Sequence, residues 1–339
     1  MSSETDWIHK RLEEEFVAAE GEASVLDLDT ARYIIFSDHH KGQRDGADDF
    51  WRCERAYHAA LGYYYESGHT LVVLGDVEEL WECRPKNVVA SYEYTLQLES
   101  DFYEDGRYLR YSGNHDDEWE SVSSVEKYLR KFFPEFEVRQ AARFRVQQQG
   151  TDLGTLFLAH GHQGTTFSDR HRWLAKFVVR NVWRPIQRFL KVPSTTPAKD
   201  FKLRQKHDRT LYAWAAGHEK TLFVAGHTHR PVFGGLAHHA ELEQALAEAS
   251  GPRAAELRAE LEWIKAQEGE QPGDTDAPDQ PVKPCYFNTG CCSFGDGDIT
   301  GLEIIDGAIR LVRWPNDAGD PKPKILASAD LASEIYAEL

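Results

Sequence analysis

The sequence lacks the features that mark membrane proteins and disulfide-rich secreted proteins. Its 339 residues include no apolar run of the length needed to cross a bilayer. The first residues, MSSETDWIHKRLEEEF, are too polar and acidic for a signal peptide. The five cysteines form no CxxC pair, so a zinc-finger spacing is not indicated. We therefore expect a cytoplasmic protein whose cysteines are reduced and structural.

The sequence also lacks the excess of positive charge that is typical of nucleic-acid-binding proteins. Its formal net charge is −17, which disfavours generic attraction to nucleic acid, and no duplex DNA partner is expected. The hydrophobic share of 41% and the aromatic share of 12% are those of a globular protein. A chain of this length can bury a large core.

The first third of the chain alternates between strand-like and helix-like segments. Short β-rich apolar runs at 32–37, 70–75 and 107–113 predict buried strands. The segments between them, at 48–66 and 87–104, predict helices, and a further helix is expected over 4–20. Strand–helix–strand alternation predicts an α/β core with a largely parallel sheet.

Beyond residue 130 the pattern changes to shorter β-like runs, which predict a second sheet packed on the first. Asp306-Gly307 stands between two alternating runs and predicts a hairpin. Two insertions interrupt these strands: a basic, mostly helical segment at 163–218, and an acidic helix followed by a loop at 237–283. We therefore divide the chain into an N-terminal helical extension, 1–30, and one domain, 31–339, that carries both insertions.

Five short polar motifs follow predicted strands directly. They are Asp38-His39-His40, Gly75-Asp76, Gly113-Asn114-His115-Asp116, His160-Gly161-His162 and Gly226-His227-Thr228-His229. Since ligands of open α/β sheets bind at the carboxyl ends of the strands, all five motifs are expected to converge on one site. A single His-x-His or Asp-x-His motif is more often an ordinary surface or core feature. Five of them at strand ends indicate a shared function.

The spacing within the motifs indicates metal binding. Residues two apart at a strand end point the same way, so Asp38 with His40, and His227 with His229, can each present two ligands to one locus. Carboxylate, imidazole and amide groups form a mixed N/O set that suits manganese, iron or zinc better than calcium. The seven candidate ligands, Asp38, His40, Asp76, Asn114, His160, His227 and His229, are too many for one transition metal and suit two metals with a bridging carboxylate.

The motifs, in this order, resemble those of the calcineurin-like metallophosphoesterases over residues 32–236 and 284–314. The resemblance implies a two-sheet α/β-β/α sandwich and two divalent metal ions, Mn²⁺ first, with iron or zinc as alternatives. It implies that Asp38, His40 and His229 hold one metal, that Asn114, His160 and His227 hold the other, and that Asp76 bridges them. His115 matches the family's histidine that contacts the phosphate and leaving group, and Asp116 matches the orienting partner of that histidine.

Two positions depart from the family pattern. Glu78 stands where most members have Asp, and we interpret it as a hydrogen-bond acceptor behind the metal ligands. The fourth motif reads His160-Gly161-His162, where several relatives have His-Gly-Asp. His160 is assigned as the ligand, and His162 remains a competing candidate.

The resemblance implies hydrolysis of a phosphate ester or anhydride through a metal-bridging hydroxide. Two other readings stay open: a cyclic-nucleotide or nucleic-acid phosphodiesterase, and a metal-binding scaffold without turnover. The basic insertion looks like the lid of bacterial UDP-2,3-diacylglucosamine pyrophosphatases, although that subfamily usually has Arg where His115 stands. The substrate is accordingly expected to be a phosphorylated small molecule or a nucleotide-linked lipid.

Residues 170–209 concentrate positive charge, with twelve Lys or Arg against two Asp. Within this stretch basic residues recur every four positions from Arg172 to Arg188, which on a helix places them on one side, opposite an apolar side. One interpretation is a cap helix packed on the domain with a solvated basic face. The other is a lid that contacts anionic lipid, which would place the protein peripherally on the inner face of the membrane.

The two interpretations of the basic stretch predict different behaviour with vesicles. If the stretch contacts lipid, reversing Arg172, Arg180 and Arg188 to Glu weakens binding to anionic vesicles by orders of magnitude, because each cation contributes about 1 kcal/mol of attraction. Added salt has the same effect, and hydrolysis of a small soluble ester is unchanged. Vesicle cosedimentation at low salt measures this, and a wild-type protein that ignores anionic vesicles would show that the stretch is only a packed cap.

Overall fold

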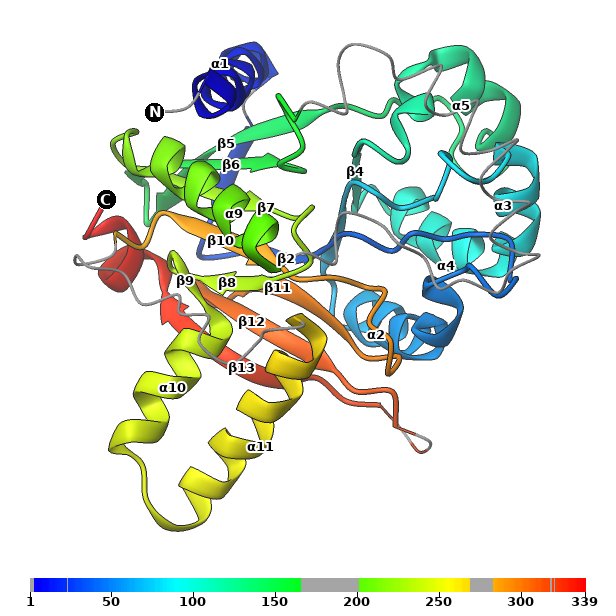
Figure 1. Ribbon diagram of the computed structural model, residues 1–339. Coiled ribbons are helices and arrows are strands. Elements are labelled where there is room, and N and C mark those ends of the chain that lie inside the picture. The colour runs from blue at the N-terminus through cyan, green and yellow to red at the C-terminus, as the bar shows by residue number, and fades with distance from the viewer. Residues whose placement is uncertain (1–2, 23, 166–200, 269–282, 318, 320) are drawn as a thin grey trace.

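Two β-sheets packed face to face, with helices on both outer surfaces, form the body of the protein (Figure 1). The computed structural model describes residues 3–22, 24–165, 201–268, 283–317, 319 and 321–339. The expectation of a two-sheet α/β-β/α sandwich is confirmed by this arrangement.

The first sheet has six strands in the order β13-β12-β11-β2-β3-β4. Its parallel half contains the strands expected near the N-terminus, and its antiparallel half contains the hairpin at Asp306-Gly307. That hairpin therefore joins the first sheet and not the second, and the sheet is mixed where a largely parallel one was expected. The strands are β2 (Arg32–Phe36), β3 (Thr70–Leu74), β4 (Tyr108–Tyr111), β11 (Ile299–Ile305), β12 (Ala308–Trp314) and β13 (Lys324–Asp330).

The second sheet has seven strands in the order β1-β5-β6-β7-β10-β8-β9. Its strand β1 belongs to the segment 1–30, so this segment is not a purely helical extension. The strands are β1 (Ser24–Asp27), β5 (Ala141–Gln148), β6 (Thr151–Ala159), β7 (Thr221–Ala225), β8 (Pro231–Phe233), β9 (Leu236–Ala237) and β10 (Tyr286–Thr289).

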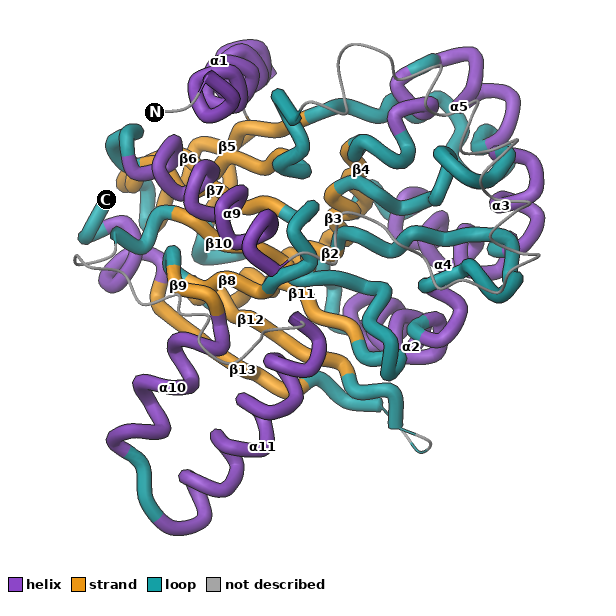
Figure 2. Tube along the Cα trace, viewed as in Figure 1, coloured by secondary structure: helices purple, strands orange, loops and turns teal. Residues whose placement is uncertain are grey.

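Alternation along the strands builds three packed layers of apolar side chains. Ile35 of β2 points into the core between the sheets, whereas Ile34 and Phe36 point outward, because successive residues of a strand face opposite sides. The outer face of the first sheet is covered by α2 (Glu54–Glu66), α3 (Pro85–Ser91), α4 (Glu93–Glu104) and α5 (Val122–Tyr128) (Figure 2). The helix expected over 87–104 is thus two helices, which meet at Tyr92.

The outer face of the second sheet is covered by α1 (Ser3–Ala18) and α9 (Phe201–Ala216). Helix α1 buries Leu12 and Phe16 against Phe157 of β6, and α9 buries Leu211 and Trp214 in the same cluster. Helix α9 is the described end of the basic insertion. Residues 166–200 lie outside the described residues, as does most of the stretch for which we predicted contact with lipid.

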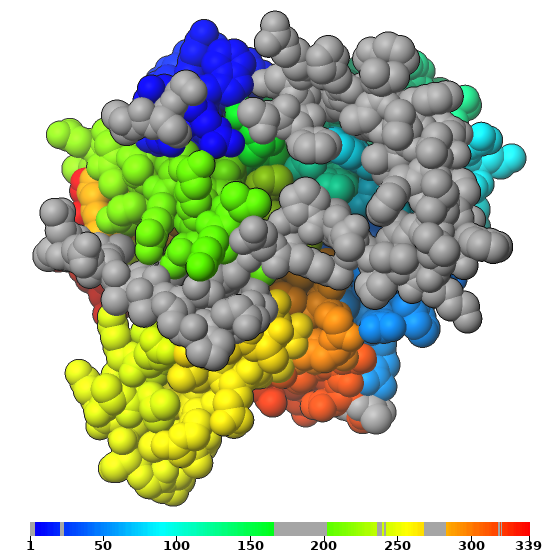
Figure 3. Space-filling model, in the orientation of Figure 1, coloured from blue at the N-terminus to red at the C-terminus, as the bar shows by residue number. Residues whose placement is uncertain are grey.

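The acidic insertion forms a helical hairpin of α10 (His238–Glu248) and α11 (Gly251–Glu268), which stands out from the body (Figures 1 and 3). Its own small core contains Leu242, Leu257 and Ile264. The loop expected after this helix, 269–281, lies outside the described residues. Within the described ranges, no helix is both long and apolar enough to span a membrane.

Candidate metal centre

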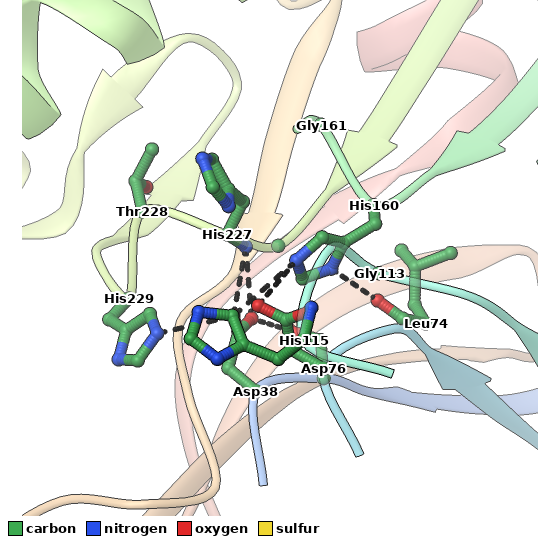
Figure 4. A network of polar contacts seen from close by, with 12 residues as sticks. Asp38, Leu74, Asp76, Gly113, His115, His160, Gly161, His227, Thr228 and His229 are labelled. Atoms are coloured by element: carbon green, nitrogen blue, oxygen red, sulfur yellow. Dashed lines mark hydrogen bonds and ion pairs between the residues drawn. The ribbon is translucent and has the colours of Figure 1, made fainter. Parts of the chain in front are cut away.

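The five polar motifs converge at one edge of the sandwich, as their positions after strands predicted. Asp38, Asp76 and Asn114 follow β2, β3 and β4 of the first sheet, whereas His160 and His227 follow β6 and β7 of the second. Figure 4 shows the side chains of Asp38, Asp76 and His160 close together, with Asp38 and Asp76 coming from the first sheet and His160 from the second. The site therefore depends on the packing of both sheets.

Six of the seven predicted ligands form two compact groups whose candidate ligand atoms lie within 4.8 Å of one another. The first group contains Asp38, His40 and His229; the second contains Asp76, His160 and His227. A third group overlaps both, since it joins His40 and Asp76 to His115. His229 Nε2 lies 3.2 Å from Asp38 Oδ1, and His160 Nε2 lies 3.1 Å from Asp76 Oδ2 (Figure 4). The first and second groups match the two-metal division implied by the family resemblance, and ligation itself stays a prediction.

Two buried polar atoms at the site fit a bound cation. Within the described residues, the buried Asn114 Oδ1 has no hydrogen-bond partner, and the buried His160 Nε2 faces the carboxylates of Asp76, at 3.1 Å, and Asp38, at 3.8 Å. The other ring nitrogen of His160, Nδ1, lies 2.8 Å from the carbonyl oxygen of Leu74 and donates to it. This contact turns Nε2 toward the two carboxylates, as in metal-binding histidines, whose second nitrogen usually donates to a carbonyl or carboxylate.

The backbone of the candidate ligands is held in a conformation that L-amino acids rarely adopt. Of the ten non-glycine residues with positive φ in the described part of the chain, five are predicted ligands. They are Asp38 (54°), His40 (51°), Asp76 (51°), His227 (70°) and His229 (57°). Each costs on the order of 1–3 kcal/mol, and such residues persist only where the surrounding structure enforces them, most often at functional sites.

Hydrogen bonds between the loops enforce this conformation. The amide of Asp38 donates to the carbonyl of Gly75 over 3.1 Å, and the amide of His40 donates to the carbonyl of Asp76 over 2.9 Å. A Cβ at Gly113 would lie 2.1 Å from Asp76 Oδ1, so only glycine allows this approach of β4's loop to the predicted bridging carboxylate. The loops after β2, β3 and β4 therefore form one connected unit.

The two central aspartates are fully buried and held ionised. Asp38 accepts hydrogen bonds from the amide of His227 and the hydroxyl of Ser37, and Asp76 accepts one from the amide of His115. Burial alone would raise the pKa of Asp38, but nearby His229 and His160 outweigh it and lower the pKa. The pKa of Asp76 is held well below its usual value, since His160 and His115 outweigh burial in the same way.

The histidines divide into two classes. Burial acts to lower the pKa of His40 and of His160, but the surrounding carboxylates outweigh it and raise these pKa values to about 10 and about 9. Burial lowers the pKa of His227 and of His229, and the neighbouring histidines His207 and His160 add to the shift at His227. Without metal, the positive charges of protonated His40 and His160 balance the negative charges of the buried carboxylates.

His115 has a different carboxylate partner from the one expected. Its Nδ1 lies 2.7 Å from Glu79 Oε2, and its ring stacks on Trp81 at 5.2 Å between centroids. Burial would lower the pKa of His115, but the carboxylates of Glu79 and Asp76 outweigh it and raise the pKa. Glu79 also contacts His40 Nδ1 at 3.2 Å, so this one side chain orients both histidines.

Asp116 lies behind the loop and not against the His115 ring. Its carboxylate accepts hydrogen bonds from the amides of Gly113 and Val77, over 2.6 and 3.0 Å, which join the β4 loop to the β3 loop. The orienting contact assigned to Asp116 therefore belongs to Glu79. Glu79 follows Asp76 by three residues in the sequence, but nothing in the pattern indicated its contacts.

The two departures from the family pattern have clear places in the structure. Glu78 accepts hydrogen bonds from buried Arg110 of β4 and from Trp119 Nε1, so it joins the loop after β3 to β4 and to the segment that follows the β4 loop. His162 lies 5.5 Å from His160 between ring centroids and belongs to neither compact group. The geometry therefore favours His160 over His162 as the ligand of the fourth motif.

Comparison with known proteins adds little. No family model and no curated protein matches the chain. Among solved structures, the chain is similar to vacuolar protein sorting 29 from Cryptosporidium parvum, with 12% sequence identity and a TM-score of 0.35. The match covers 89% of this chain and 100% of that chain. A likeness this remote carries no argument about function, which must come from the site itself.

The protonated histidines predict that metal binding releases protons. Below pH 9, His40 and His160 carry protons that a metal must displace, so Mn²⁺ binding at pH 7 is expected to release about two protons per chain. Because the carboxylates stay ionised throughout, apparent affinity rises with pH from 7 to 9 and levels off above about pH 10. Calorimetry in buffers of different ionisation enthalpy measures the release. Binding without it would mean that both imidazoles are neutral at pH 7.

Proposed function

We propose that the protein is a binuclear metal-dependent phosphoesterase that hydrolyses a phosphate ester or anhydride. The observation that carries the proposal is the set of five predicted ligands with left-handed backbone, which converge from strand ends of two sheets. Residues held in this conformation cluster at active sites and ligand-binding loops. The donor set of carboxylates, imidazoles and one amide oxygen suits divalent cations such as Mn²⁺, with iron or zinc as alternatives.

The two groups give each residue a role toward the metals. Asp38, His40 and His229 would hold one cation, and Asn114, His160 and His227 would hold the other, with Asp76 between them. When bound, two such cations neutralise the charge of a phosphate group and activate water for attack on phosphorus. The protein contributes buried carboxylates that stay ionised, and imidazoles whose orientation is fixed by hydrogen bonds such as that from His160 to Leu74.

His115 is the candidate proton donor to the leaving oxygen. The carboxylates of Glu79 and Asp76 raise its pKa, which favours the imidazolium form, and the contact with Glu79 together with the stacking on Trp81 fixes the orientation of the ring. Its amide also donates to Asp76 Oδ1 over 2.8 Å, which ties the proton donor to the predicted bridging carboxylate. The candidate ligand atoms of His115, His40 and Asp76 also lie within 4.8 Å of one another. His115 is therefore a candidate metal ligand as well, and a direct test must separate the two roles.

The class of substrate is a further part of the proposal. A phosphorylated small molecule or a nucleotide-linked lipid is favoured by the basic stretch 170–209, of which only 201–209 are described. There, Lys206 pairs with Glu4 and Arg204 lies buried against the carbonyl of Thr228. Metal-loaded protein assayed on phosphomonoesters, phosphodiesters, cyclic nucleotides and a nucleotide-sugar lipid identifies the class. Two bound metals without turnover of any of them would favour the scaffold reading.

Asp76→Asn tests the bridging role. The change keeps the shape of the side chain and removes its charge, so activity on the best substrate of the screen should nearly vanish while the fold is kept. Elemental analysis should find fewer than two metals per chain. As a matched control, Asp306→Asn changes an exposed aspartate of a remote hairpin and leaves both quantities unchanged. Near-normal turnover of Asp76→Asn with two metals bound would contradict the bridging assignment.

His115→Ala tests the proton donor. We expect both metals to remain bound and turnover to fall by about 10²–10⁴-fold, as is typical when a general acid is removed. His58→Ala is the control, because His58 is a partly buried histidine that contacts Thr95 on the helices behind the first sheet. Loss of half the metal from His115→Ala would show that His115 is a ligand.

A further inference from the structure

A buried acidic residue of α9 connects the end of the basic insertion to the predicted metal ligands. Asp208 is 7% exposed, and its carboxylate accepts hydrogen bonds from three side chains of the second sheet and its loops. Oδ1 accepts from the hydroxyls of Thr228 and Tyr286, each over 2.9 Å, and Oδ2 accepts from Arg230 Nη1 over 3.0 Å. Thr228 and Arg230 flank His229, so one carboxylate fixes the chain on both sides of a predicted ligand.

The loop that Asp208 fixes is one of the strained segments of the site. His227 and His229 have φ of 70° and 57°, and Thr228 lies between them with its side chain directed away from the metal groups, toward α9. Asn288 supports the same loop from β10, because its amide donates to the carbonyl of Gly226 over 2.6 Å and to Thr228 Oγ1 over 3.2 Å. Left-handed residues of this kind need such external support.

A second contact from α9 reaches the other histidine loop. His207, adjacent to Asp208, donates from Nε2 to the carbonyl of Gly161 over 2.7 Å, and its ring lies 5.1 Å from that of His227. Neighbouring residues of one helix thus contact the loop after β6 and the loop after β7. The helix holds the two loops of the second sheet in place behind the ligands, as the outer hydrogen-bond partners of metal sites do.

We propose that Asp208 is a positioning residue for His227 and His229, and that α9 sets the metal affinity of the site. The inference rests on the proposed function, since it requires that these histidines bind metal. Asp208 does not touch a metal ligand's ring and acts through Thr228 and Arg230. Both metals depend on this loop, because His229 belongs to one group and His227 to the other.

The test compares Mn²⁺ binding by calorimetry with thermal stability in a set of variants of the full chain. Asp208→Ala should weaken Mn²⁺ binding by about 10–100-fold, the usual effect of removing an outer partner of a metal site. Asp208→Asn should bind Mn²⁺ nearly as wild type, because its amide oxygen still accepts from Arg230 and the hydroxyl groups can turn to accept from its nitrogen. Its melting temperature falls nonetheless, since Arg230 loses its buried counter-charge.

A matched pair of single-hydroxyl deletions keeps the test valid if Asp208→Ala does not fold. Thr228 and Tyr286 donate to the same oxygen at the same distance, but only Thr228 lies between the histidines. Thr228→Val should therefore weaken Mn²⁺ binding, whereas Tyr286→Phe should not. Glu303→Ala is the control for general destabilisation. It removes a buried carboxylate of β11 that pairs with Arg310 of β12, so it should lower stability without changing Mn²⁺ affinity.

The outcomes separate the two claims. Wild-type protein that binds no divalent cation would overturn the proposed function. Wild-type protein that binds two cations, with Asp208→Ala and Thr228→Val binding them equally tightly, would overturn the positioning role alone. Loss of Mn²⁺ affinity in step with melting temperature across all variants, Glu303→Ala included, would also overturn it, because the effect would then be one of stability.

Discussion

The architecture of the site depends on one constraint, which is that short loops after five strands must turn within two or three residues and still aim ligand side chains at a common point. The left-handed residues Asp38, His40, Asp76, His227 and His229 satisfy it. Their strain is offset by hydrogen bonds between neighbouring loops, such as that from Asp38 to Gly75, and by the close approach that Gly113 permits. The parallel pairing of β2, β3 and β4 makes those bonds possible, since it places three loops side by side.

The same geometry explains the electrostatics of the site. Asp38 and Asp76 are buried close together and ionised, an arrangement that is unfavourable unless positive charge lies between or beside them. His40 and His160 supply that charge as imidazolium groups when no metal is bound, which raises their pKa values. A site whose histidines hold protons beside buried carboxylates is suited to exchange those protons for divalent cations.

Local sequence patterns predicted many of the elements and the convergence of the candidate ligands, but not the pairing of all strands or the contacts behind those residues. The strands at 32–37 and 70–75, the hairpin at Asp306-Gly307 and the convergence of the five motifs were all found, because each depends on residues near in sequence. The assignment of the hairpin to a second sheet was wrong, since pairing of β11 with β2 joins residues far apart in the chain. Asp116, and not Glu79, was expected to orient His115 for a related reason. Residues on irregular loops follow no helical or strand periodicity, so the sequence does not indicate the direction of their side chains.

Asp208 shows how a summed charge can hide a buried residue of the opposite sign. The stretch 170–209 was interpreted from its twelve basic residues, and charge of one sign in a helix ordinarily indicates a solvated face. An acidic residue in such a basic stretch would ordinarily be expected to form ion pairs with neighbouring Lys or Arg side chains at the surface. Asp208 lies buried and accepts hydrogen bonds from Arg230, Thr228 and Tyr286, which are outside the stretch. Burying a carboxylate among distant donors is costly unless the donors are held in place for it, so this exception to the charge pattern marks the point where α9 contacts the loop that carries His227 and His229.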